Sequence, residues 1–185
     1  KPVEILFLSN LIESKGVYAL LEACKILKKN GIIFHCTYVG GEGDISAEEL
    51  KQRIDKLDLS EVVHYAGRKY GAEKSEVFSK ADIFVLPTFY SNECFPLVLL
   101  EAMQFSLPII STFEGGIPDI VENNISGFLV HQRDIIDLAE KLELLINNPP
   151  MRQKMGTAGR KKYEADFTLA AFEVRLTTIL KELVK

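Results

Sequence analysis

The sequence predicts an α/β fold: a Rossmann-like, doubly wound parallel sheet of about six strands with helices on both faces and further helices appended at the C-terminus. Short apolar runs alternate with segments of helical spacing along most of the chain. The turns that join them are short, and many contain glycine or proline. Strands that alternate with helices in this way form a parallel sheet covered on both faces. Because no long linker or repeat interrupts the pattern, we expect residues 1–185 to form a single domain.

Short apolar runs are the expected strands. The run at residues 32–39 is rich in β-branched and aromatic residues, which favour strands. Gly40, Gly67 and Pro87 directly follow three of the runs and mark where those strands end. The expected strands are residues 3–8, 32–39, 62–66, 83–86, 108–111 and 127–130.

Segments with helical spacing follow these runs. The apolar residues at 17–27 repeat at the spacing of one helix face, and Gly31 is a usual stop beyond them. Ser46 and Glu49 have the spacing of a capping box, so we expect a helix over residues 47–57. The other expected helices are residues 73–80, 97–105, 117–121, 135–146, 151–164 and 169–184.

Prolines mark two helix boundaries. Pro96 suits the first helical position before the apolar run at 97–105, because the missing N–H of proline costs nothing there. Pro149 and Pro150 are expected to separate the helix at 135–146 from the next one.

The composition narrows the class of protein. Hydrophobic residues make up 47% of the chain and charged residues 26%, which is enough for a core and a solvated surface. The net charge is −4 and acids are interspersed with bases, which argues against a nucleic-acid-binding protein. The basic cluster Arg160-Lys161-Lys162 is flanked by acids, and it favours a solvated helix face over a membrane-surface patch.

Other features concern the compartment and the extent of the chain. Cys24, Cys36 and Cys94 show no CxxC spacing, so we expect free thiols in a reducing, cytoplasmic compartment. The sequence shows no signal peptide and no apolar run near the ~18 residues that suggest a membrane span. It begins at Lys1 rather than at Met, and we expect it to be a segment of a longer protein.

Ligands of an open parallel sheet bind beyond the carboxyl ends of its strands. In this chain, the turns at those ends carry glycines, cations or the start of a helix. Glycine lets a backbone approach a ligand closely, and lysines and helix N-termini favour phosphate. Together they predict a pocket for a nucleotide-like, phosphorylated ligand, although the Gly40-Gly41 turn alone is more typical of a plain turn. The residues at these turns are Ser9, Asn10, Lys15, Gly16, Gly40, Gly41, Gly67, Arg68, Lys69, Glu93, Gly115 and Gly116.

The segment around Glu93 and Glu101 carries the strongest ligand-binding signal. Glu93 lies in the loop before an apolar helix, and Glu101 lies more than one turn inside it. A carboxylate among apolar residues needs a partner, and we interpret the partners of Glu101 as ligand hydroxyls. The N–H groups of Leu97, Val98 and Leu99 are unpaired donors at the positive end of the helix dipole, which favours an anion. The alternatives are a solvated loop acid for Glu93 and a lysine-paired helix acid for Glu101.

Ordered sequence blocks carry a family resemblance. They are SKG before the first helix, VGGEGD after the second strand, ADIFVLPT before the loop of Glu93, NECFPLVLLEAM across Glu93 and Glu101, and EGGIPDIVENNISGFLV beyond it. The most specific of them is the Glu-x7-Glu spacing of Glu93 and Glu101. In these blocks the chain resembles the C-terminal, donor-binding domain of GT-B fold glycosyltransferases of family 4, also called group 1. The resemblance covers nearly the whole chain.

The resemblance implies transfer of a sugar from a nucleotide diphosphate sugar with retention of anomeric configuration. It implies that Glu101 binds the ribose hydroxyls and that Glu93, as the catalytic residue, faces the donor sugar and the reacting centre. Lys15 and the backbone amides of Leu97 and Val98 would hold the diphosphate, and the base would lie near the turn at 68–70. The other donor-binding residues that it implies are Asn10, Gly40, Gly41, Arg68, Cys94, Phe95 and Pro96.

The resemblance implies no cofactor besides the donor, which is expected to be a UDP- or GDP-sugar. Cations and helix dipoles can stabilise the leaving diphosphate, so no metal is required, and the sequence has no Asp-x-Asp pair or histidine cluster to hold one. GT-B enzymes have a second, N-terminal domain, which we expect to bind a saccharide or lipid-linked acceptor. This implies a role in polysaccharide or glycolipid biosynthesis and allows peripheral association of the whole enzyme with the inner face of the membrane. The final helix is similar to the one that crosses back toward that domain.

The sequence departs from the family pattern at the donor site. Ser9 and Asn10 stand where the family usually has Gly-Arg, which removes one diphosphate contact. Cys94 and Pro96 replace glycines of the common motif. Because proline has no N–H, a phosphate must rely on the amides that follow Pro96.

Two other functions stay open at this point. A nonhydrolysing sugar-nucleotide epimerase has the same GT-B architecture, although the Glu-x7-Glu block speaks against it. A noncatalytic, transferase-like module could instead bind a partner through its last helices, and the missing arginine at Asn10 is the best support for it.

Overall fold

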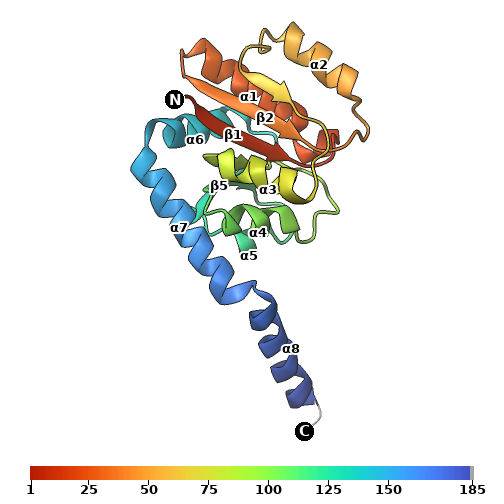
Figure 1. The fold of residues 1–185 in the computed structure, drawn as a ribbon, viewed down its shortest axis with the longest axis vertical. Helices are drawn as coiled ribbons and strands as arrows, with labels where there is room; N and C mark the ends of the chain where they lie inside the picture. The colour runs from red at the N-terminus through yellow and green to blue at the C-terminus, as the bar shows by residue number, and fades with distance from the viewer. Residues whose placement is uncertain (184–185) are drawn as a thin grey trace.

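A six-stranded parallel sheet forms the centre of the computed structural model, which describes residues 1–183 (Figure 1). The strands are β1 (Val3–Leu8), β2 (Phe34–Val39), β3 (Val63–Tyr65), β4 (Ile83–Val85), β5 (Ile109–Thr112) and β6 (Gly127–Val130). Their order is β3-β2-β1-β4-β5-β6, and every neighbouring pair is parallel. The strand order reverses at β1: the connections after β1 and β4 lead to opposite ends of the sheet. Open α/β sheets bind ligands at such a switch point.

The expected helices are present, and a short 3₁₀ helix that the sequence analysis did not predict precedes the first of them. The helices are η1 (Glu13–Lys15), α1 (Val17–Lys29), α2 (Ala47–Lys56), α3 (Gly71–Lys80), α4 (Leu97–Gln104), α5 (Ile117–Ile120), α6 (Ile135–Asn147), α7 (Pro149–Asp166) and α8 (Leu169–Leu183). The expected strand ends differ from the observed ones by no more than about two residues, which is the usual scatter of element boundaries. Val184, the end of the last predicted helix, lies outside the described residues.

Helices cover both faces of the sheet, as the doubly wound prediction requires (Figure 1). On one face α1 packs beside α6, and the Asn30 side chain reaches Glu143 at 3.4 Å. On the other face α3 packs beside α4, where the rings of Phe78 and Phe105 stack with centroids 5.2 Å apart. The fold class predicted from the sequence is therefore confirmed.

The central strands are mostly apolar because both of their faces are largely buried. Phe7 of β1 and Tyr38 of β2 are fully buried, with ring centroids 5.0 Å apart. The Tyr38 hydroxyl donates to the Val17 carbonyl at 3.0 Å, so the buried phenol has the partner it needs. This contact ties the start of α1 to the sheet, directly after the loop that carries Lys15.

Local sequence signals set several helix ends. The capping box is confirmed: the Ser46 N–H donates to the Glu49 carboxylate at 2.7 Å, and the Glu49 N–H donates to the Ser46 hydroxyl at 3.2 Å. Pro149 and Pro150 were predicted to separate two helices, but they form the first turn of α7. Asn148 is the residue between α6 and α7, and its side chain caps α7 by accepting from Met151 N–H at 3.0 Å. Proline is tolerated in the first turn because its missing N–H would have no helical partner there.

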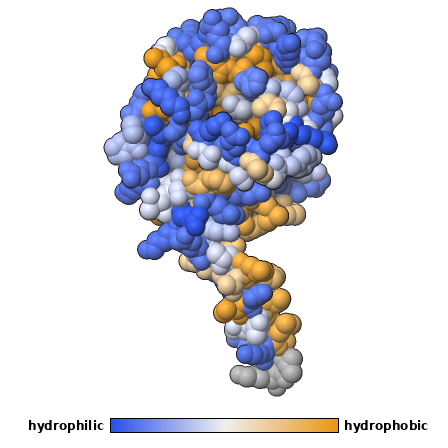
Figure 2. Space-filling model, viewed as in Figure 1, coloured by the Kyte–Doolittle hydropathy of each residue, from blue (hydrophilic) through white to orange (hydrophobic). Residues whose placement is uncertain are grey.

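The helix α8 projects away from the rest of the molecule (Figure 1). None of its described side chains is buried. Apolar atoms cover much of the helix in Figure 2, and Leu169, Phe172, Leu176, Ile179 and Leu183 are each more than two-fifths exposed. An exposed apolar surface of this kind marks an interaction site. Within residues 1–183, no helix has the length and apolar character to cross a bilayer.

Candidate functional site

Close backbone packing brings the loops after β1 and β4 together at the switch point. Gly16 has a left-handed φ of +86°, and a Cβ there would lie 2.3 Å from the Pro87 carbonyl oxygen. The Phe89 N–H donates to the Ser14 carbonyl at 2.7 Å. Only glycine fits at residue 16, so this turn can lie directly against the segment that follows β4. These contacts on either side of Lys15 hold it next to the loop that carries Glu93.

Lys15 and Glu93 form a buried ion pair. Lys15 Nζ lies 2.6 Å from Glu93 Oε2, and the side chains are only 16% and 8% exposed. The ammonium group also lies 4.5 Å from the centre of the Tyr90 ring, within cation–π range. The Thr88 hydroxyl lies 3.3 Å from the same Glu93 oxygen. Glu93 is therefore not a solvated loop acid, and that alternative is wrong. Thr88 and Tyr90 also contact this ion pair, and neither residue was predicted to be part of the site.

Gly115 and Gly116, which follow β5, pack against the backbone of the Glu93 loop. Gly115 has φ +51°, and a Cβ there would lie 1.6 Å from the Glu93 carbonyl oxygen. The Gly116 N–H donates to the Cys94 carbonyl at 2.8 Å. The position of the Glu93 backbone thus depends on glycine at residue 115, since any side chain would displace the loop.

The first turn of α4 supplies backbone donors beside this loop. Pro96 was predicted at the first helical position, but it is the N-cap, with an extended ψ of 104°, and the helix begins at Leu97. Leu99 was predicted to have a free N–H, but its N–H donates to the Pro96 carbonyl at 3.0 Å. The N–H groups of Leu97 and Val98, in the first turn, have no helical carbonyl to bond. Two donors, rather than the predicted three, are therefore available to an anion.

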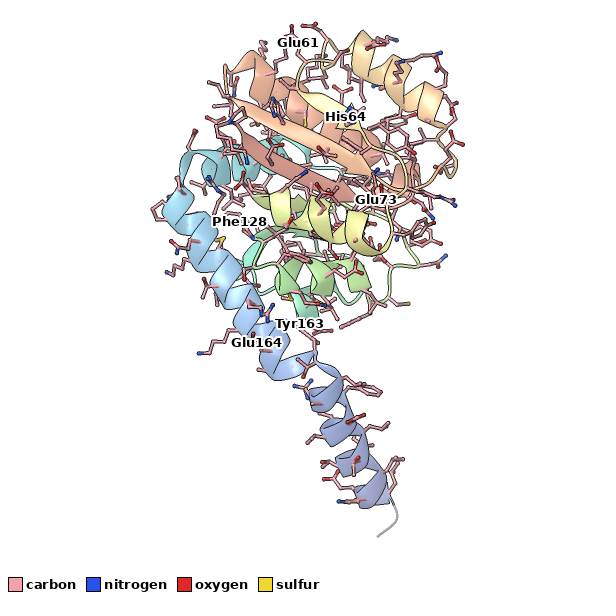
Figure 3. The ribbon with its side chains drawn as sticks, viewed as in Figure 1. Glu61, His64, Glu73, Phe128, Tyr163 and Glu164 are labelled. Carbon is pink, nitrogen blue, oxygen red and sulfur yellow. The ribbon has the colours of Figure 1, made fainter. Side chains whose placement is uncertain are left out.

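Glu101 lies one turn further along α4, with a partner that the sequence analysis did not identify. Glu101 Oε1 lies 2.7 Å from Lys74 Nζ, and the two side chains are 36% and 28% exposed. Lys74 lies on the first turn of α3, next to Glu73, which Figure 3 labels. The ion pair matches the alternative of a lysine-paired helix acid, and it leaves the Oε2 atom of Glu101 without a partner among residues 1–183. No pattern within one stretch of the sequence marks Lys74 as this partner, because the contact depends on how α3 packs beside α4.

Asn10, Gly40, Gly41 and Arg68 lie together where β1, β2 and β3 end. The Asn10 side-chain oxygen accepts from the Gly41 N–H at 3.3 Å. A Cβ on Gly40 would lie 1.8 Å from the Ser9 carbonyl oxygen, and a Cβ on Gly41 would lie 2.0 Å from Arg68 Nε. Gly40 is therefore needed for packing between the loops, with or without a ligand, whereas at residue 41 the exposed Arg68 side chain can move to make room. Arg68 is exposed and lies across this corner.

Tyr65, the last residue of β3, contacts the turn at Gly40. Its hydroxyl donates to the Gly40 carbonyl at 2.9 Å. Burial raises the pKa of Tyr65, and the nearby Glu42 carboxylate raises this pKa further, while Arg68 lowers it. The phenol therefore stays a neutral donor to the Gly40 turn.

Cys94 and Phe95 complete the predicted set, and their side chains lie outward. Cys94 is the exposed member of the three free cysteines. The Phe95 ring is 41% exposed and packs edge-on against Phe167, with centroids 5.8 Å apart. The structure thus brings Lys15 and Glu93 together at the loop that leads into α4, whereas the Phe95 side chain contacts the C-terminal segment instead.

A surface groove, about 900 Å³ in volume, lies between α1 and the segment that leads into α6. It contains none of the predicted donor-binding residues, so size alone does not point to the predicted site. No cluster of three or more His, Cys, Asp or Glu side chains suited to a metal ion occurs in the part of the chain that the structure describes.

Comparison of the sequence with known protein families shows which family the chain belongs to. Residues 1–162 match the model of the glycosyl transferases group 1. The chain belongs to this family. It is 35% identical over 187 residues to the amylovoran biosynthesis glycosyltransferase AmsK of Erwinia amylovora, and the match covers 99% of this chain and 46% of that protein. The chain thus spans about half the length of the curated relatives it matches.

Solved structures place this group 1 chain among the C-terminal domains of GT-B glycosyltransferases. Sucrose-phosphate synthase from Thermosynechococcus elongatus superposes with a TM-score of 0.86 at 25% identity, over 100% of this chain and 46% of that one. Anabaena HepE in complex with UDP and glucose superposes with a TM-score of 0.85 at 21% identity, over 97% of this chain and 48% of that one. The HepE likeness establishes the fold alone.

Proposed function

We propose that this chain is the nucleotide-sugar-binding, C-terminal half of a retaining glycosyltransferase that acts in polysaccharide biosynthesis. The observation that carries the proposal is the buried Lys15–Glu93 pair beside the first turn of α4. A cation, free helix N–H groups and a carboxylate in one place suit a ligand that has both a diphosphate and sugar hydroxyls. Membership of the group 1 family supports the same conclusion.

The diphosphate would bind between Lys15 and the N–H groups of Leu97 and Val98. Negative charge develops on the nucleoside diphosphate as the sugar leaves, and donors fixed in advance stabilise that charge most. Lys15 is well placed for this role because its neighbours hold the ammonium group at the edge of the sheet. These protein charges form the basis for expecting no metal requirement.

The two carboxylates would bind different hydroxyl groups. Glu93, next to Lys15, would accept from hydroxyls of the donor sugar and orient the reacting carbon. Glu101, one turn along α4, would use its free oxygen to accept from the ribose hydroxyls. The base would lie against the turn that carries Arg68 at the end of β3. Asn10, Gly40 and Gly41 would form the wall of the pocket on that side.

Two relatives indicate the chemical classes involved. The name of AmsK refers to amylovoran biosynthesis, which supports a polysaccharide as the product. The HepE structure contains UDP and glucose, which is in keeping with a nucleotide-sugar donor for this chain.

The acceptor would bind a second domain outside this chain. The chain spans about half the length of its curated relatives, and α8 exposes an apolar surface with no partner in the described structure. We propose that α8 packs against that domain and that the acceptor, a saccharide or lipid-linked molecule, binds between the two. Such an enzyme would act in the cytoplasm or at the inner face of the membrane.

Isothermal titration calorimetry with UDP, GDP and ADP tests the proposal. We expect heat of binding with UDP or GDP, and no sugar transfer by this chain alone. Glu101→Ala should weaken the binding by about 1–3 kcal/mol, the scale for leaving polar groups unpaired. Absence of binding to all three nucleotides would contradict the proposal and favour the noncatalytic module, for which Asn10 in place of arginine is the supporting observation.

A further inference from the structure

The Lys74–Glu101 ion pair is anchored by an aromatic stack one turn away. Lys74 and Phe78 lie four residues apart on α3, and Glu101 and Phe105 have the same spacing at α4. Phe78 and Phe105 stack with centroids 5.2 Å apart and an angle of 11° between the rings. Four residues rise ~6 Å along a helix, so the ion pair lies directly beyond the stack. The packing of α3 against α4 therefore places Lys74 next to Glu101.

The contact occupies one oxygen of the Glu101 carboxylate. Lys74 Nζ lies 2.7 Å from Oε1, and no hydrogen bond or ion pair from residues 1–183 reaches Oε2. About a third of each side chain is exposed, so a ligand can approach the pair from the surface. A lysine that holds one carboxylate oxygen fixes the direction in which the other one points.

We propose that Lys74 is a positioning residue for nucleotide binding: it holds Glu101 so that the free oxygen accepts from the ribose hydroxyls. The inference rests on the proposed function, in which Glu101 binds the ribose. It adds a residue from α3, an element that otherwise has no part in the site. In this role Lys74 acts through Glu101 and does not itself touch the ribose.

A lysine near an anionic ligand could also act by simple attraction, or the ion pair could serve stability alone. These roles differ in their dependence on Glu101 and on the ribose hydroxyls. Attraction of the diphosphate persists when either is removed, whereas positioning does not. A partly exposed ion pair that matters only for stability would change the melting temperature and leave the affinity unchanged.

The test is calorimetry at fixed ionic strength with UDP and with 2′,3′-dideoxyuridine diphosphate. The variants are Lys74→Met, Lys74→Arg, Glu101→Gln and the double variant Lys74→Met/Glu101→Gln. Lys80→Met is the matched control, because Lys80 is on the same helix and its 2.5 Å ion pair is with Glu76 instead. Circular dichroism confirms that each variant is folded.

We expect Lys74→Met to weaken UDP binding about fivefold, from the ~1 kcal/mol upper range of a partly exposed ion pair. Lys74→Arg and Lys80→Met should bind as the unmodified chain does. The Lys74→Met effect should disappear with the dideoxy ligand and in the Glu101→Gln background.

An equal loss of affinity with both ligands, or an unchanged affinity for UDP, would overturn the role of Lys74 while leaving the proposed function intact. If the unmodified chain fails to bind UDP or GDP at all, the proposed function fails first, and the positioning role fails with it.

Discussion

Lys15 Nζ lies 2.6 Å from Glu93 Oε2, although 78 residues separate the two in the chain. The pair is enclosed by Thr88, Tyr90 and the glycine turn that follows β5. Taking two charges out of water is costly, and the attraction between them offsets the cost only when the geometry is good. A costly pair of this kind, at the carboxyl ends of the strands where open α/β sheets bind ligands, supports the proposed site.

Removing one partner should destabilise the chain more than removing both. Lys15→Met leaves the Glu93 carboxylate buried without its cation, and we expect a loss of about 3 kcal/mol in the free energy of unfolding. The double variant Lys15→Met/Glu93→Gln should recover part of that loss, because no charge remains unpaired. Urea denaturation of both single variants and the double variant measures the coupling. Strictly additive losses would show that the ion pair contributes nothing.

Glycine at residue 115 should be essential for the position of the Glu93 loop. Gly115→Ala places a Cβ 1.6 Å from the Glu93 carbonyl oxygen, whereas Gly31→Ala, also at positive φ, meets nothing within 4 Å. The left-handed backbone costs both variants ~1–2 kcal/mol, so any excess loss in Gly115→Ala reports the collision. We expect that excess, together with weaker nucleotide binding, for Gly115→Ala alone. Equal effects of the two substitutions on stability and binding would argue against a support role for Gly115.

Thiol labelling should report on the same loop. Cys94 is exposed, while Cys24 and Cys36 are buried, and burial raises the pKa of the Cys36 thiol well above its usual value. A thiol reagent should therefore modify Cys94 alone in the folded chain, and UDP should slow that reaction. Mass spectrometry with and without the nucleotide locates the modified residue. Labelling of Cys94 at the same rate in saturating UDP would place the nucleotide elsewhere.

Stability in acid should depend on the capping box of α2. Backbone and hydroxyl hydrogen bonds from Ser46 hold the pKa of Glu49 below its usual value. The capping box therefore stabilises the fold at pH values above the pKa that Glu49 has in the unfolded chain. This stabilisation is lost as the pH falls through the lower pKa that Glu49 has in the folded chain. When the pH is lowered from ~6 to ~3, the free energy of unfolding should fall less in the Ser46→Ala variant than in the unmodified chain, because the variant has no capping box to lose.

A serine that bonds a carbonyl provides the control for that measurement. The Ser79 hydroxyl donates to the Glu76 backbone carbonyl, so Ser79→Ala should leave the pH dependence unchanged. Urea midpoints across this pH range compare the variants. An identical slope for Ser46→Ala and Ser79→Ala would contradict the assignment.

The sequence predicted the sheet and its helices because those signals are local. Apolar runs, glycine stops and the Ser46–Glu49 spacing each act within a few residues, and the structure confirms them. The family resemblance also located the loop and helix that carry Glu93 and Glu101. These features follow from patterns that one stretch of the chain contains by itself.

The partners of the two carboxylates could not be predicted in the same way. Lys15 meets Glu93 only because Gly16 and Pro87 bring two distant loops into contact. Lys74 meets Glu101 only because α3 and α4 lie side by side. Such pairs depend on tertiary packing, which periodicity and spacing do not encode.

A crystal structure of this chain with UDP or GDP shows directly where the nucleotide binds. We expect the diphosphate at Lys15 Nζ and at the N–H groups of Leu97 and Val98, with the ribose hydroxyls at Glu101. A nucleotide bound instead in the groove between α1 and α6, with the Lys15–Glu93 edge of the sheet vacant, would contradict this expectation.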